Sequence, residues 1–317
     1  MKYSLFFLFL FFQYCSPVFE ELKIGTNKWQ GYEPLYLSRH RGQFENKPIH
    51  LVEFDSSSQV LRFLRNKKLN SAGLTLDEAI FLKDQGINIK IIMIMDISNG
   101  ADILIARKGI SSVLDLKGKR VGVENTAMGA YYLARILNKY DLSVKDLEVI
   151  HLEVQDHLKS FESNKVDALV SFSSFESQFH RMGGNVIFDS SMIPGEITDV
   201  LIVDQEYLKQ NRPIVKSLLR IWFKTIESKN FTSDESIQYM AKRDGISLED
   251  FRSVSHKLII PNLKENFGLL TGDETGFRKA FDGLVSHMLN SNLITKPLKY
   301  DDMIDNRIIQ ELYYEVK

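Results

Sequence analysis

Cysteine is almost absent from this chain of 317 residues, which contains only Cys15. A single cysteine excludes a framework of disulfides within the chain, so the fold must depend on its hydrophobic core. Hydrophobic residues make up 44% of the sequence. The roughly 300 residues after Cys15 are enough for one large core or, as we expect, two.

Neither positive nor negative charge dominates the sequence, since the net charge is -1 and no long basic run occurs. Nucleic acid is therefore not an expected partner. The seven histidines are scattered without the spacing of a metal site, and neither a Gly-x-Ser-x-Gly motif nor a phosphate-binding glycine loop is present. We predict no metal, no cofactor and no enzymatic activity.

Apolar runs long enough to span a bilayer are missing after Cys15. Before it, Met1-Lys2 and the apolar run from Leu5 to Phe12 have the layout of a secretory signal. A cysteine directly after such a run favours bacterial lipoprotein processing, although Tyr14 stands where a small residue is usual. The alternative is an ordinary secreted protein with an incidental cysteine. We predict a lipoprotein-type signal peptide over residues 1–15, lipidation of Cys15, and a periplasmic or extracytoplasmic protein tethered to a membrane.

Short apolar runs alternate with helical segments from Leu22 to about residue 203. The first unit pairs a strand at 22–25 with a helix from Pro34, and a second set of units begins with a strand at 119–123. This alternation predicts parallel sheets wrapped by helices, which is an α/β fold. Beyond Asp204 the strands stop and amphipathic helices follow, so the C-terminal part is a helical tail.

Two sets of units and a tail indicate two lobes, the first of them interrupted. The chain is expected to leave lobe 1 near 103–106 and to return near 200–203, so that two extended crossovers form a hinge. Lobe 1 then comprises residues 20–104 and 203–317 with the helical tail, and lobe 2 comprises 105–202. A ligand cleft would lie between the lobes, at the carboxyl ends of the strands.

A family resemblance is carried by five stretches in a fixed order: Lys23–Leu37, Gly73–Ala79, Gly122–Tyr131, Phe188–Ser191 and Ile193–Leu201. They resemble substrate-binding proteins of the nitrate, aliphatic sulfonate and taurine importer class, whose superfamily also includes binders of thiamine-pyrimidine precursors. The resemblance implies a type II periplasmic-binding-protein fold that closes on its ligand by hinge motion. It also implies a small-molecule ligand, an ABC permease and its ATPase as partners, and we expect a monomer.

Loops at the strand ends supply the candidate ligand-binding residues. Small polar groups can hydrogen-bond a head group there, and aromatic rings can cover a flat ligand. Each candidate has a structural alternative: the aromatic rings can pack in the core, the hydroxyl and carboxylate residues can cap helices or turns, and the acid before the second crossover can brace the hinge. The candidates are Thr26, Asn27, Trp29, Tyr32, Ser57, Thr75, Asp77, Asn99, Glu124, Thr126, Phe172 and Glu196.

Acidic residues outnumber basic ones in these loops, where Lys28 is the one base. A site for a doubly charged anion would usually contain arginine. We therefore predict a ligand that is cationic or amine-bearing, such as a planar heterocycle of the pyrimidine kind, or a zwitterion. The acids are Asp55, Asp77, Glu78, Asp96, Asp102, Glu124, Glu176, Asp189, Glu196 and Asp199.

Two other functions are weighed against solute binding for an importer. A free binding protein could report its ligand to a membrane kinase or cyclase. An enzyme of thiamine-pyrimidine biosynthesis is the other alternative. A resemblance to such an enzyme would imply a cysteine-rich motif and a functional histidine, whereas the single cysteine here is Cys15. The extracytoplasmic solute-binding component of an ABC importer is the function that we predict.

The predicted lipid anchor can be tested at Cys15. The substitution Cys15→Ser removes the thiol that would be acylated, so the protein should move from the membrane fraction to the soluble fraction on cell fractionation. Membrane association that is unchanged by this substitution would contradict the anchor.

Overall fold

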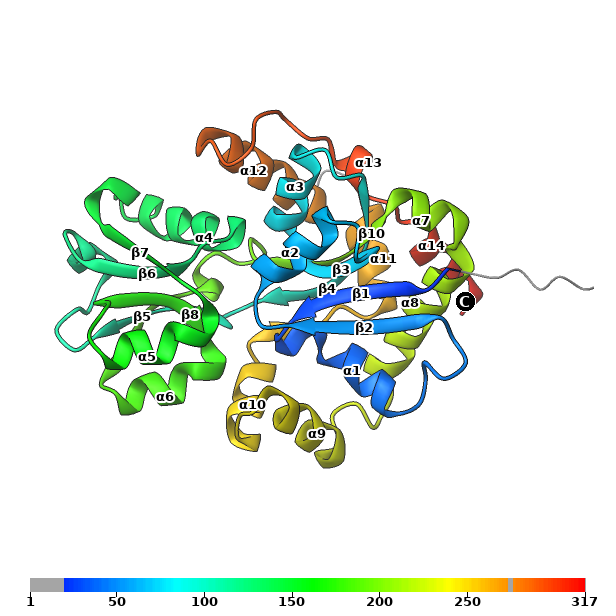
Figure 1. Ribbon diagram of the computed structural model, residues 1–317, viewed down its shortest axis with the longest axis horizontal. Helices are drawn as coiled ribbons and strands as arrows, with labels where there is room; N and C mark the ends of the chain where they lie inside the picture. The colour runs from blue at the N-terminus through cyan, green and yellow to red at the C-terminus, as the bar shows by residue number, and fades with distance from the viewer. Residues whose placement is uncertain (1–19, 273–275, 317) are drawn as a thin grey trace, which may run out of the picture.

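The computed structural model describes residues 20–272 and 276–316. The predicted signal peptide and Cys15 lie outside these residues. Two α/β lobes lie side by side, each built around its own sheet (Figure 1). None of the helices in the described part of the chain combines the length and the apolar character needed to span a bilayer.

Lobe 1 contains a six-stranded sheet of order β11-β4-β10-β3-β1-β2. Strands β1, β2 and β3 are parallel, and β10 runs antiparallel to its neighbours β3 and β4. Apolar side chains of β4 and β10 are buried, except that Ile97 is half-buried, as expected for central strands. The strands are β1 (Leu22–Asn27), β2 (Ile49–Phe54), β3 (Ser71–Thr75), β4 (Ile89–Ser98), β10 (Thr198–Asp204) and β11 (Leu258–Ile259).

Lobe 2 contains a five-stranded sheet of order β7-β6-β8-β5-β9. Its strands are β5 (Asp102–Arg107), β6 (Arg120–Glu124), β7 (Glu148–Leu152), β8 (Ala168–Phe172) and β9 (Gly184–Asp189). Helices follow the strands as the sequence pattern predicts. They are α1 (Glu33–His40), α2 (Ser57–Arg65) and α3 (Leu76–Asp84) in lobe 1, and α4 (Ala127–Asn138), α5 (His157–Glu162) and α6 (Glu176–Arg181) in lobe 2.

Helices dominate the chain after β10, as predicted, but the two-residue strand β11 shows that strands do not stop entirely at Asp204. Helix α8 (Arg212–Ile226) buries Leu218, Leu219 and Trp222 against the core of lobe 1. The other helices are α7 (Gln205–Gln210), α9 (Asp234–Asp244), α10 (Leu248–Ser255), α11 (Leu263–Thr271), α12 (Phe277–Asn290), α13 (Tyr300–Met303) and α14 (Arg307–Glu315).

The predicted lobe boundaries are wrong by a few residues. The boundary at 104/105 falls inside β5, which pairs along its length with β8 and β9 of lobe 2. The boundary at 202/203 falls inside β10, which belongs to the sheet of lobe 1. Both strands are apolar runs next to a crossover, and hydrophobicity alone does not indicate which of two sheets a buried strand joins. The crossovers are residues 99–101 and 190–197.

The two crossovers are hydrogen-bonded to each other. The Ser98 amide donates to the Ile197 carbonyl (3.0 Å), and the Ser98 and Ser190 hydroxyls lie 2.7 Å apart. The Gly100 amide also donates to the Ser190 hydroxyl (2.7 Å). Because these groups are buried, the bonds hold the two segments together as one hinge.

The lobes also touch on two sides of this hinge. On one side, Lys257 Nζ of lobe 1 lies 2.5 Å from Glu176 Oε2 of lobe 2. On another, the His287 ring of α12 lies edge-on to the Tyr131 ring of α4, with 5.4 Å between ring centroids. The two lobes are therefore in direct contact on two sides of the hinge.

Candidate ligand-binding site

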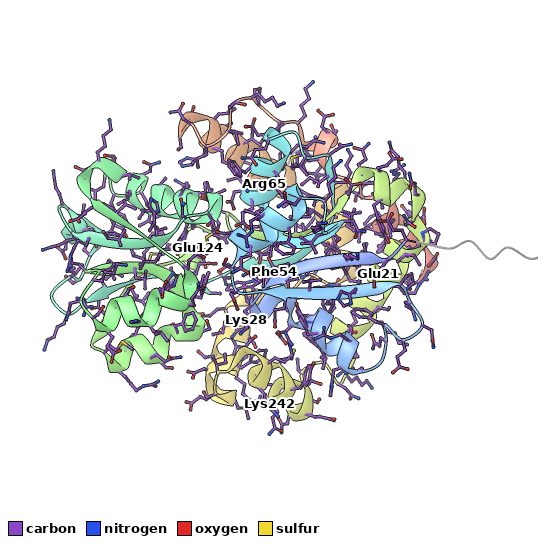
Figure 2. The ribbon with its side chains drawn as sticks, viewed as in Figure 1. Glu21, Lys28, Phe54, Arg65, Glu124 and Lys242 are labelled. Carbon is purple, nitrogen blue, oxygen red and sulfur yellow. The ribbon has the colours of Figure 1, made fainter. Side chains whose placement is uncertain are left out.

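A cavity lies between the lobes, where strands from both sheets end. Its empty volume is about 450 Å³, part of it open to solvent. Figure 2 shows Glu124 at the edge of lobe 2 that faces lobe 1. The lining residues are Asn27, Trp29, Tyr32, Ser57, Thr75, Glu78, Asp96, Ser98, Asp102, Glu124, Thr126, Met128, Phe172, Ile197 and Asp199. We call this space the inner cavity.

Eight of the predicted candidates line the inner cavity, because the carboxyl ends of parallel strands meet at one edge of a sheet. They are Asn27, Trp29, Tyr32, Ser57, Thr75, Glu124, Thr126 and Phe172. This location is consistent with ligand contact, which remains a prediction.

Four predicted candidates lie elsewhere. Thr26 is fully buried, with its hydroxyl 2.5 Å from that of Tyr36. Asn99 is exposed in the first crossover, Asp77 is buried at the start of α3, and none of the three lines the inner cavity. Side chains alternate along a strand, so Thr26 faces away from the cavity that its neighbour Asn27 lines.

Glu196 is the fourth, and its contacts are those of a brace in the second crossover. It accepts hydrogen bonds from Tyr131 Oη (2.7 Å) and from Arg135 Nε and Nη2 (2.5 and 2.6 Å). Both partners belong to α4 of lobe 2. The alternative in which Glu196 braces the hinge therefore describes its position better than the alternative in which it faces the cavity.

Seven lining residues were not among the predicted ligand contacts: Glu78, Asp96, Ser98, Asp102, Met128, Ile197 and Asp199. A usable signal existed for three of them. Asp96, Asp102 and Asp199 lie inside or beside the apolar strands β4, β5 and β10. A carboxyl group in a buried strand needs a partner or a function.

Two aromatic rings from opposite lobes meet at the cavity. Trp29 of lobe 1 and Phe172 of lobe 2 are edge-on, with centroids 5.5 Å apart. Trp29 Nε1 lies 3.2 Å from both carboxylate oxygens of Asp96, and its ring packs against Val254 and Leu258. Trp29 therefore both lines the cavity and packs against a small core, so the two interpretations of it are compatible.

The charged residues of the described chain that line the inner cavity are all acidic. Its lining includes Glu78, Asp96, Asp102, Glu124 and Asp199, and no lysine, arginine or histidine from the described part of the chain. Several carboxylate oxygens are buried without a hydrogen-bond partner in the described chain, namely Asp102 Oδ2, Glu124 Oε1 and Asp199 Oδ1. Such oxygens can accept hydrogen bonds from a bound molecule.

Burial raises the pKa of these carboxyl groups. Loss of water raises the pKa of Asp96 and of Asp102 to about 7, and the charge of Asp102 adds to the effect on Asp96. Burial, followed by the charge of Glu78, raises the pKa of Glu124 to about 8. Burial also raises the pKa values of Glu78 and Asp199. A cation in the inner cavity would lower these pKa values and displace the protons.

Metal binding receives no support from geometry, because residues 20–272 and 276–316 contain no cluster of three or more His, Cys, Asp or Glu side chains suited to a metal ion. The carboxyl groups of the inner cavity can accept hydrogen bonds from amines, and its rings can cover a flat molecule.

Comparison with known proteins gives a consistent result. Residues 29–229 match a family model described as NMT1/THI5 like. The taurine-binding periplasmic protein of Escherichia coli is 19% identical over 53% of this chain and 53% of its own length. The chain spans about half the length of the curated relatives that it matches.

Solved structures share the fold over nearly the whole chain. The alkanesulfonate-binding protein SsuA of Xanthomonas axonopodis superposes with a TM-score of 0.74 at 18% identity, covering 92% of this chain and all of the other. The ligand-binding component of an ABC-type import system from Staphylococcus aureus gives a TM-score of 0.76 at 14% identity, with 92% and 98% covered. The predicted two-lobed periplasmic-binding-protein fold is confirmed.

Gly31 offers a test of how tightly the site is packed. A Cβ atom there would lie 1.8 Å from Asp96 Oδ2 and 2.8 Å from Trp29 Nε1. Gly31→Ala should therefore displace both side chains and lower the free energy of unfolding by about 1–3 kcal/mol. The matched control is Gly268→Ala in α11, where a Cβ has open space and should add about 0.5–1 kcal/mol. Urea denaturation measures both, and equal effects would contradict the packing described.

The raised pKa values predict how stability depends on pH. In the folded chain Glu124 keeps its proton up to about pH 8, whereas in the unfolded chain it loses the proton near its ordinary value of 4.5. Its contribution to stability is therefore present at low pH and is lost as pH rises toward 8. Between pH 5.5 and 7.5 this amounts to about 2.5 kcal/mol.

The substitution Glu124→Gln removes that ionisation without changing the size of the side chain. Its free energy of unfolding should fall less than that of the wild type between pH 5.5 and 7.5, because one proton no longer differs between the folded and unfolded states. Urea midpoints in an amine-free phosphate buffer measure the difference. Identical pH slopes for the two proteins would show that Glu124 ionises freely.

Proposed function

Because this chain belongs to the NMT1/THI5-like family, we propose that it is the extracytoplasmic solute-binding component of an ABC importer. It binds a small amine-bearing or heterocyclic cation in the inner cavity and presents it to a permease and its ATPase. The observation that carries this proposal is the lining of the cavity, which contains five acidic residues and no basic residue from the described chain.

The sign of the charge decides which class of ligand fits. A sulfonate or nitrate in the inner cavity would face carboxyl groups, and the described residues that line it include no arginine or lysine to neutralise the anion. An ammonium, amidinium or aminopyrimidinium group would be attracted by the same carboxylates and would donate to their unpaired oxygens. The ligand class proposed here therefore differs from taurine and alkanesulfonate, for which the relatives named above are known.

Each wall of the cavity has a separate part in binding. The amine end would be held by Asp96 and Asp199 on lobe 1, while Glu124 reaches the ligand from lobe 2. The rings of Trp29 and Phe172 would part to admit a flat ligand between them, since their present edge-on contact leaves no room for one. Binding to both lobes at once would favour the closed form.

The proposed lipid anchor would hold a particular end of the molecule at the membrane. Strand β1 runs from Leu22, at the end of lobe 1 remote from lobe 2, to Asn27 at the cavity (Figure 1). A lipid on Cys15 would therefore tether the protein by the end opposite the ligand. Solved structures of similar fold include binding components of importers, which supports a binding protein and not an enzyme.

A thermal-shift screen of residues 16–317 tests the function. The probes are benzylamine, 4-aminopyrimidine, lysine, taurine, butanesulfonate and nitrate. A ligand at 100 times its dissociation constant stabilises the folded state by about 2.7 kcal/mol, which raises the melting temperature by several degrees. We expect stabilisation by the cationic amine or the pyrimidine. Stabilisation by sulfonate or nitrate alone would overturn the ligand class and leave the solute-binding role.

The Glu124→Gln variant assigns any hit to the inner cavity. It should weaken binding of a cationic probe by about tenfold or more, since a charge-assisted hydrogen bond contributes about 1.5–3 kcal/mol. The matched control is Glu162→Gln, which changes an exposed acid of lobe 2 outside the cavity. Equal affinity of both variants would remove Glu124 from the site.

A further inference from the structure

A second cavity adjoins the first, and its empty volume is about 850 Å³, part of it open to solvent. The two cavities share Asn27, Trp29 and Phe172, so the pair of rings stands between them. We call this space the outer cavity. Its lining is Asn27, Lys28, Trp29, Gln30, Asp55, Val154, Gln155, Phe172, Ser174, Phe175, Asp244 and Ile246.

Part of this lining comes from the helical tail. We call residues 234–259, which contain α9, α10 and β11, the arm; its helices α9 and α10 lie below lobe 1, next to lobe 2 (Figure 1). Ile237, Met240 and Phe251 of the arm pack on Leu37 of lobe 1. Lys257 joins the arm to lobe 2 through Glu176. Asp244 and Ile246 of the arm line the outer cavity.

Asp244 is held in place by its neighbour Arg243. The Arg243 guanidinium lies 3.8 Å from the centroid of the Tyr36 ring and makes ion pairs with Glu33 (3.1 Å) and Glu53 (2.5 Å) of lobe 1. These contacts fix the end of α9, so the polar groups of the outer cavity are pre-organised.

The outer cavity contains two polar side chains whose hydrogen bonds within the described chain are poorly formed. Gln30 is 6% exposed, and neither its Nε2 nor its Oε1 makes a hydrogen bond of normal distance and angle there. Asp244 is half-buried, and its two carboxylate oxygens make no such bond either, although Glu33 and Gln30 lie close enough to interact with them. Buried polar groups are usually well paired. An amide and a carboxyl group with poorly formed hydrogen bonds on one cavity wall are therefore suited to a ligand group that would complete them.

We propose that the outer cavity is a second subsite, which binds a hydrogen-bond-donating group such as an amine or amide at the far end of the ligand. The proposal rests on the function proposed above, in which the ring of the ligand lies between Trp29 and Phe172. One end then meets the carboxyl groups of the inner cavity. The other end meets Asp244 and Gln30.

The charged residues at the rim do not set this preference. Lys28 and Asp55 are both exposed and of opposite sign, and Lys28 lies between the sheet of lobe 1 and the arm (Figure 2). Because both are exposed, water screens their charges. Gln30, which is buried, and Asp244, which is half-buried, are therefore the groups that would decide what the outer cavity binds.

The test compares two probes that differ only at the far end. Isothermal titration calorimetry measures 4-methylbenzylamine, which has one amine, and 1,4-bis(aminomethyl)benzene, which has a second amine in place of the methyl group. On the wild-type protein the diamine should bind at least tenfold more tightly, well beyond the factor of two that its equivalent ends provide.

The variants Asp244→Asn and Gln30→Leu then test the assignment, each removing one of the proposed partners. Either should lower the affinity ratio of the two probes toward two. The matched control Glu249→Gln, at an exposed acid on the same arm, should keep the wild-type ratio. Two variants are used because Asp244 also lies beside Glu33 and Arg243, and a change in its packing alone would not be reproduced by Gln30→Leu.

The outcomes separate the two proposals. A diamine preference that survives both variants, or a wild-type ratio near two, overturns the outer subsite while amine binding in the inner cavity stands. Failure of both probes to bind overturns the proposed amine ligand and the outer subsite with it.

Discussion

The site depends on one constraint: several carboxyl groups share a cavity to which the described residues contribute no basic side chain. Carboxylates are stable in water or beside a cation, and closure of the lobes removes the water. Burial raises the pKa values of Asp96, Asp102 and Glu124, so these groups keep their protons at a pH at which exposed carboxyl groups are ionised. A bound cation would replace those protons, so the charge of the ligand and the closure of the lobes are coupled.

The hinge and the site are built from the same short segments. Ser98 lines the inner cavity and also bonds to Ser190 of the second crossover, and its hydroxyl accepts from the Asp102 amide (3.2 Å). Asp96 and Asp199 sit opposite each other where β4 and β10 pair, close to both crossovers. Movement of the hinge must therefore move the carboxyl groups, and a ligand bound to them resists opening.

Much of this could be predicted from the sequence, because strand periodicity and loop chemistry are local. The two lobes, the order of the elements and residues such as Trp29, Glu124 and Phe172 at the cavity follow from the pattern. The lobe boundaries and the acids inside β4 and β10 do not, since both depend on which strands pair, and pairing joins residues about a hundred positions apart. The proposed role of Asp244 could not be predicted either, because its place at the outer cavity depends on how the arm packs on lobe 1.

The arm is a third part of the molecule that contacts the site from outside the two sheets. Its helices pack on α1 of lobe 1 and contact η5 (Ser173–Phe175) of lobe 2, so it is in contact with both moving bodies. Trp29 rests on its residues Val254 and Leu258, and that ring in turn donates to Asp96. A chain of direct contacts thus runs from the arm through one aromatic ring to a carboxyl group of the inner cavity. A substitution in the arm that shifts Trp29 would weaken its hydrogen bond to Asp96, and would thereby change the charge that a ligand meets although the substituted residue does not contact the ligand.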